Sequence, residues 1–320
     1  MKDFGFYSAG FSDVVLSDGI EICGDEEGAK NEEFIVASSP KLKAQIYAPQ
    51  INFYIANTKD EPLVIAQNVD ILYEAAAAAF DGALYSDHQK PVGKNVILAS
   101  DAPDEELVAL LKQHGFKVIA LSRDEIKFVY GEIGDLSVSI SGKEGEFEVQ
   151  SDFFLVCGAQ AYQLRQSGCY EISGLKNDEI LEILQSKSPV YRYRNSTIFD
   201  PAICQYQGRR NDLCAKCVEV CPTVAILKND EKRELVFSHI DCIGCGECVS
   251  VCPSGALKFA PLPQSVFYEI SKLYKGKIPL LIAEGEISSA LKIELPCGVL
   301  PFGIFGSKQI DEVNLLSVMQ

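Results

Sequence analysis

The sequence is poor in basic residues and in long apolar runs. Its 29 Lys and Arg are outnumbered by 45 Asp and Glu, which gives a formal net charge of −16. This balance argues against nucleic acid as a partner, because phosphate binding needs Lys and Arg gathered on one face. No apolar run approaches the length of a bilayer span, and the start of the chain lacks the basic, apolar and small-residue order of a signal peptide. We therefore expect a cytoplasmic protein without a membrane span.

Nucleotide-binding motifs are also missing. No G-x-G-x-x-G follows a predicted strand, and there is no G-x-x-x-x-G-K-[ST]. The chain has only three histidines, at 88, 114 and 239, and they are isolated from one another in the sequence. His114 is expected at a helix end, where it meets the helix dipole. The first half of the chain therefore offers no catalytic constellation.

Charged residues and cysteines are unevenly distributed along the chain, and this distribution suggests domain boundaries. Residues 1–150 hold 26 acidic and 12 basic residues, a balance of −14, whereas 201–262 balance at seven against seven. Eight of the twelve cysteines fall between Cys204 and Cys252. Without an export signal, such cysteines indicate metal ligation in a reducing compartment rather than disulfides. We expect an acidic α/β domain over 1–186, a cysteine-rich domain with a basic lead-in over 187–262, and a small α/β segment over 263–320.

Local patterns predict a multidomain α+β or α/β fold. A β-α-β unit is expected between residues 94 and 121: a strand at 94–100, a helix that begins at Asp101 or Asp104 and ends before Gly115, and a strand at 116–121. Further strands are expected at 33–37, 45–48, 52–56, 136–140, 146–149, 153–157, 278–283 and 290–295, and helices at 70–84 and 313–319. The last helix stops without a cap or a polar tail, so a fragment of a longer protein is one interpretation.

The most specific pattern lies between residues 242 and 253. Cys242, Cys245, Cys248 and Cys252 stand at spacings of two, two and three, and a proline follows. Three thiolates from one short loop can converge on three iron corners of a cubane cluster. The glycines between the first three cysteines let the backbone wrap closely around the sulfides.

A near-copy precedes this run. Cys214, Cys217, Cys221 and the following proline match it, but Asn211 stands where the first cysteine would be. Between the two runs, 225–227 and 235–237 are expected to pair as a hairpin, and 256–259 is the equivalent strand after the second run. By these residues, the block at about 200–262 resembles a two-cluster bacterial ferredoxin.

This resemblance implies two [4Fe-4S] clusters with crossed ligands. One cluster would be held by Cys242, Cys245, Cys248 and Cys221. The other would be held by Cys214, Cys217, Cys252 and one ligand that the motif does not supply.

Several groups compete for that last position. Cys204, in a loop rich in Gly and Arg, is the preferred candidate. Alternatively, the site holds a [3Fe-4S] cluster, or a cubane whose open iron is bound by water or Asp212. A thiolate from elsewhere is the third alternative, and the candidates are Cys157, Cys169 and Cys297. A pair of zinc sites is the competing interpretation of the whole block, which the complete spacing disfavours.

A basic segment leads into this block. From Lys187 to Arg210 it carries Lys187, Arg192, Arg194, Arg209 and Arg210 against Asp200 alone, a balance of +4, together with Tyr191, Tyr193 and Tyr206. It is either a docking surface for an acidic redox partner, a mouth for an anionic substrate, or a set of charges that offsets the clusters.

The sequence as a whole predicts an electron-transfer iron-sulfur protein. Its expected partners are other subunits of a cytoplasmic oxidoreductase complex, such as a dehydrogenase or hydrogenase subunit. No catalytic residue is predicted. The alternative is an enzyme in which an iron without a protein thiolate binds an anionic substrate.

Overall fold

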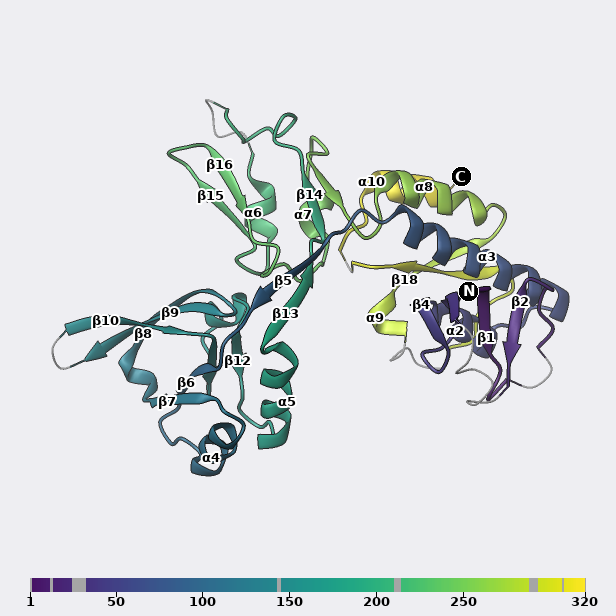
Figure 1. Cartoon of the computed structure of the whole chain (residues 1–320). Helices are drawn as coiled ribbons and strands as arrows, with labels where there is room; N and C mark the ends of the chain where they lie inside the picture. Colours follow the sequence, from purple (N-terminus) through teal and green to yellow (C-terminus); the bar gives the residue numbers. More distant parts are fainter. Residues whose placement is uncertain are drawn as a thin grey trace. The chain divides into compact units, whose positions relative to one another are not determined.

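The computed structural model describes residues 2–11, 14–24, 33–142, 145–209, 214–287, 293–306 and 308–319. The chain forms two compact units, and each is discontinuous in sequence (Figure 1). The first comprises Met1–Tyr85, Thr197–Asp200 and Gly244–Gln320, and the second comprises Ser86–Ser196 and Pro201–Ile243. The expected domains, 1–186, 187–262 and 263–320, follow one another along the chain and therefore differ from these units. Packing between distant segments causes the difference.

The first unit contains a parallel sheet with the strand order β2-β1-β3-β4. Its strands are β1 (Lys2–Tyr7), β2 (Ile20–Cys23), β3 (Glu33–Ala37) and β4 (Lys43–Tyr47). Helices α2 (Pro49–Asn57), α3 (Pro62–Gly82) and α8 (Gln264–Leu273) pack in the same unit, where α3 contacts both α2 and α8. The C-terminal part adds the parallel pair β18 (Ile278–Ala283) and β19 (Val299–Ile304), with α9 (Glu284–Ile287) and α10 (Glu312–Val318).

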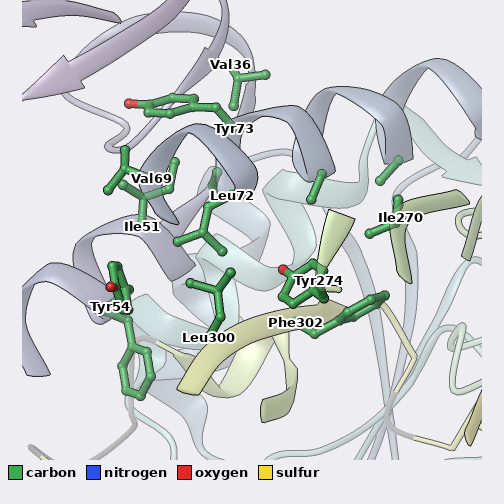
Figure 2. Packing of buried hydrophobic residues seen from close by; sticks show 14 of the residues in the cluster. Val36, Ile51, Tyr54, Val69, Leu72, Tyr73, Ile270, Tyr274, Leu300 and Phe302 are labelled. Carbon is green, nitrogen blue, oxygen red and sulfur yellow. The ribbon is translucent and has the colours of Figure 1, made fainter. Parts of the chain in front are cut away.

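One hydrophobic core joins the two ends of the chain in this unit (Figure 2). Leu72 on α3 and Leu300 on β19 are both fully buried in it, although more than two hundred residues separate them. Tyr274 also lies in this core, and its hydroxyl donates to the Pro301 carbonyl at 2.7 Å. Because each large side chain buried here contributes about 1.5–3 kcal/mol, the contacts bind the C-terminal segment to the N-terminal sheet.

The strand expected at 52–56 is wrong: these residues lie in α2. Asn52–Ala56 are rich in β-branched and aromatic residues, which favoured a strand. Pro49 stands in the first turn of the helix, and Ile51 and Tyr54 are buried three residues apart, on one helical face. Burial of that face therefore outweighs local strand propensity.

Helix α3 begins earlier than expected and is long. Its 21 residues are apolar enough to cross a membrane by length and composition, with 39% of the window buried. The sequence argument that no apolar run approaches a bilayer span overlooked it. In the first unit, one face of α3 packs into the core through Val69, Leu72, Tyr73 and Ala79, as a core helix does.

The second unit is built in three layers. Its middle layer is the parallel sheet β12-β11-β6-β7, formed by β6 (Asn95–Ala99), β7 (Lys117–Leu121), β11 (Phe153–Val156) and β12 (Cys169–Glu171). Alternate residues of β6 and β11 point to opposite faces. Leu98 and Leu155 pack with α4 (Glu105–Gln113) and α5 (Asn177–Lys187). Ile97 and Phe154 pack with the antiparallel sheet of β8 (Ile126–Glu132), β9 (Asp135–Gly142) and β10 (Gly145–Ser151).

The expected β-α-β unit is confirmed as β6-α4-β7. The Asp104 carboxylate caps α4 by accepting the Glu106 and Leu107 N–H groups, and Gly115 has a positive φ of 83° just past the helix. The expected hairpin is also confirmed: β15 (Ile226–Asn229) pairs antiparallel with β16 (Glu234–Phe237). Half of the strand expected at 290–295, residues 290–292, lies outside the described residues. The other half forms no strand, and Leu295 makes only an isolated bridge with Thr58.

Two further strand pairs frame the cysteine-rich block. In the first unit, β14 (Thr197–Phe199) pairs antiparallel with β17 (Leu257–Phe259). In the second unit, β5 (Asp87–Pro91) pairs antiparallel with β13 (Val190–Arg194), which lies in the basic lead-in. The remaining short helices are η1 (Arg123–Glu125), η2 (Gln163–Arg165), α6 (Lys216–Val220) and α7 (Glu247–Ser250).

Candidate metal centres

The two cysteine runs fold as structural repeats. In each run a short helix begins inside a Cys-x-x-Cys segment and contains its second cysteine: α6 contains Cys217 and α7 contains Cys248. A turn and a strand come next, β15 after the first run and β17 after the second. The matching residues Cys217 and Cys248 are equally buried, each 8% exposed. The sequence repeat is therefore also a repeat of local conformation.

Both runs turn at the residue that precedes the short helix. Ala215 has a φ of 101° and Gly246 a φ of 83°, so each is left-handed. Only glycine adopts this region without strain, and alanine there is uncommon. The same turn therefore occurs in both runs, although in the first run it falls on a residue that adopts it only with strain.

A C-terminal segment of the first unit packs against the second run. The Lys308 N–H donates to the Cys245 carbonyl at 2.9 Å. A Cβ on Gly306 would lie 2.7 Å from the same carbonyl oxygen, so only glycine permits this approach. The Lys308 ammonium donates to the Glu247 carboxylate at 2.6 Å. Gly306 and Lys308 thus hold the loop of Cys245, a role that the sequence analysis missed.

An arginine holds the end of the first run. The Arg165 guanidinium in η2 donates to the carbonyls of Cys221, at 3.3 Å, and Thr223, at 3.1 Å. The Val224 N–H in turn donates to the Arg165 carbonyl at 3.1 Å. An exposed positive charge therefore lies beside a predicted ligand.

The loop of Cys204 is anchored to the hairpin that joins the two runs. The Tyr206 side chain is fully buried, and its hydroxyl donates to Asp230 at 2.8 Å. The Cys204 sulfur is buried and accepts the N–H groups of Tyr206 and Gln207, both at 3.4 Å. Arg209 donates to the Cys204 carbonyl at 3.1 Å. N–H donors to a cysteine sulfur are a common feature around iron-sulfur clusters.

Hydroxyl groups stand beside the last cysteine of each run. Thr223 Oγ1 lies 3.5 Å from the Cys221 sulfur, and Ser254 Oγ lies 3.8 Å from the Cys252 sulfur. Each hydroxyl comes two residues after its cysteine, so the repeat extends to the groups around the sulfurs. Donors to thiolate sulfur are a common feature around iron-sulfur clusters. The residues present therefore fit clusters held by thiolates.

The boundary between the two units falls inside the second run. Cys204, Cys214, Cys217, Cys221 and Cys242 belong to the second unit, and Cys245, Cys248 and Cys252 to the first. Within the described ranges, no three His, Cys, Asp or Glu side chains gather as ligands of a single metal ion. A cubane does not need such a group, because each of its irons takes one thiolate.

The other cysteines have different surroundings. Cys169 is the first residue of β12 and is buried in the core, and burial raises the pKa of its thiol to about 12, which keeps it protonated. Cys157 packs at the edge of the core that contacts α4 and α5. Cys297 is exposed, and its thiol lies 3.9 Å from the Lys59 carbonyl. Asn211 and Asp212 lie outside the described residues.

Two histidines that are distant in sequence lie together. The rings of His88 and His239 are stacked, with centroids 6.1 Å apart, although the two residues are isolated from each other in the sequence. Burial and the neighbouring His88 lower the pKa of His239. His114 meets the expectation, since it ends α4 and its ring contacts the Leu110 carbonyl at 3.0 Å.

The comparison with protein families agrees with these repeats. Residues 210–256 match the 4Fe-4S dicluster domain, and seven cysteines lie within the match: Cys214, Cys217, Cys221, Cys242, Cys245, Cys248 and Cys252. This part of the chain is therefore an iron-sulfur electron-transfer domain. The match begins after Cys204 and covers less than a fifth of the chain. A comparison with curated proteins found no match.

Proposed function

We propose that the chain is an electron-transfer protein that carries two [4Fe-4S] clusters and serves a cytoplasmic oxidoreductase complex. The observation that carries the proposal is the repeat of the two cysteine loops, from the left-handed turns at Ala215 and Gly246 to the hydroxyls beside Cys221 and Cys252. When bound, each cluster takes up and releases one electron. No substrate pocket is needed for such a role.

The chain's own residues would hold and tune these clusters. Cys242, Cys245 and Cys248 with Cys221 form one proposed ligand set, and Cys214, Cys217 and Cys252 with Cys204 form the other. The N–H donors to the Cys204 sulfur support a complete set of thiolates over an open iron. Arg165 and Lys308 fix the backbone of two ligand cysteines, and Arg165 also brings positive charge to the domain.

Chemical analysis of anaerobically purified protein tests the proposal. We expect about eight iron and about eight sulfide per chain, as two cubanes require. EPR of the reduced protein should show two magnetically coupled cubanes. Stoichiometric zinc with negligible sulfide would refute the proposal, and an oxidised-state signal of the [3Fe-4S] type would favour the open-iron enzyme instead.

A further inference from the structure

A groove in the second unit reaches one of the predicted iron ligands. Its walls come from β5, β13 and the segment before the second cysteine run, and Cys242 is part of them. The groove has a volume of about 620 Å³, within the range of sites that bind small molecules. Such a concave site suits a small molecule better than a flat protein surface.

Parallel aromatic rings form one side of this groove. Tyr191 and Tyr193 stack with an interplanar angle of 17°, and Tyr193 and His88 with one of 21°. His239 continues the ladder beyond His88 at 11°. The first three of these rings line the groove. Stacked rings cover one another's faces, so a planar ring would pack edge-to-face against their edges.

The charges of the groove favour an anion. Arg194 donates to Asp87 at 2.5 Å, so these two charges offset each other. Arg192 is exposed and has no ion-pair partner in the part of the chain that the structure describes. Gln89 and Ser196 add neutral polar groups. The groove thus combines one unbalanced cation, stacked rings and a predicted ligand cysteine.

We infer that this groove binds a planar redox-active ring that carries an anionic group, and that electrons pass between this ring and the cluster held by Cys242. The inference rests on the proposed function and names the small-molecule partner of the clusters. Full reduction of a flavin-type ring takes two electrons, one from each reduced cluster, and two protons from water. The clusters are oxidised by one electron each, so the exchange balances.

Flavin mononucleotide and riboflavin are suitable probes, because they share one ring and differ in the phosphate. Flavin fluorescence should be quenched on titration with the cluster-loaded protein, with flavin mononucleotide bound at least about tenfold more tightly than riboflavin, as one charged contact provides. Arg192→Gln should abolish the preference for flavin mononucleotide, and His88→Ala should weaken the binding of both probes. Arg123→Gln is the control. It changes an exposed arginine of the same unit that lies outside the groove, and it should leave the affinity for both probes unchanged.

The outcomes separate this inference from the proposed function. Iron and sulfide are measured on the same samples. Cluster-loaded protein that binds neither probe, or binds flavin mononucleotide equally well with Arg192→Gln, would overturn the groove assignment and leave the electron-transfer proposal intact. Protein that lacks iron would refute the proposed function and with it the electron exchange, whereas binding that depends on Arg192 would still support the groove.

Discussion

Ala215 and Gly246 occupy the same place in the two cysteine loops and share a left-handed backbone, with φ values of 101° and 83°. The two residues differ in what this conformation costs. Glycine adopts it readily, whereas the alanine side chain crowds the following carbonyl, at roughly 1–2 kcal/mol. The two runs therefore have one loop shape but unequal strain.

Ala215→Gly should relieve this strain. We expect the free energy of unfolding to rise by about 0.5–1 kcal/mol, because the strain that is removed exceeds the extra freedom of the unfolded glycine. The measurement is the urea concentration at which half of the cluster absorbance is lost. Ala77→Gly, in the middle of α3, is the control and should lower stability by about 1 kcal/mol. Equal destabilisation by both substitutions would contradict the argument.

Gly246→Ala should have the opposite effect, for a different reason. A Cβ at this position would lie 2.5 Å from the Cβ and 2.8 Å from the Cα of Gln309, so Gln309 must move. We expect loss of the cluster held by Cys245, with iron falling from about eight to about four per chain. Gly255→Ala is a matched control, since Gly255 also has a positive φ, of 66°, but nothing lies within 4 Å of the added Cβ. An iron content in Gly246→Ala equal to that of the unsubstituted protein would show that the close approach of Gly246 and Gln309 is not required for cluster binding.

The sequence predicted those parts of the molecule that local signals encode. The Asp104 cap and Gly115 delimit α4 from within its own segment, and the cysteine spacing alone located the repeated loops. Long-range pairing was not accessible in this way. Nothing in the sequence around Gly306 and Lys308 indicates that these residues pack on the loop of Cys245, and nothing in 197–199 indicates its pairing with 257–259. Such contacts depend on core packing that joins segments far apart in the chain, which also explains why α2 is a helix.

Removal of the Arg165 charge should lower a cluster potential. Its guanidinium donates to the Cys221 carbonyl, and a nearby cation favours the reduced cluster, which carries one more negative charge. Arg165→Gln should therefore lower the potential of the cluster that holds Cys221 by roughly 20–40 mV, which corresponds to about 0.5–1 kcal/mol for an exposed charge. An EPR-monitored redox titration measures it. Arg165→Lys keeps the charge, so its cluster potential should stay close to that of the unsubstituted protein. Equal shifts of the potential in both variants would show that Arg165 acts by positioning the Cys221 backbone and not by its charge.

Glu284 should make the first unit less stable at alkaline pH. Burial raises the pKa of this carboxyl to about 7, from an ordinary value of 4.5. A raised pKa means that the folded state favours the protonated carboxyl. The stability that this preference adds to the folded state is therefore fully present below pH 4.5 and is lost as pH rises through 7. We expect urea stability to fall by on the order of 1–3 kcal/mol between pH 5 and pH 8. Glu284→Gln should abolish most of this fall. Glu286→Gln, at an exposed position, is the control and should leave the fall in stability unchanged. If the fall persists in Glu284→Gln, another titratable group causes it.

Cys204→Ala should affect one cluster alone. Cys204 is buried, accepts two N–H groups and has Arg209 bound to its carbonyl, so it is suited to supply the thiolate that Asn211 does not. We expect the substitution to convert one cubane to a three-iron form, visible by EPR in the oxidised protein, or to remove it, with the second cubane unchanged. Cys23→Ala and Cys169→Ala should leave both clusters in place, since these thiols lie outside the cysteine runs. Two full cubanes with unchanged spectra in Cys204→Ala would show that the fourth ligand is not this thiolate. A cluster with an open iron would then become the better hypothesis, and with it an enzyme that binds an anionic substrate there.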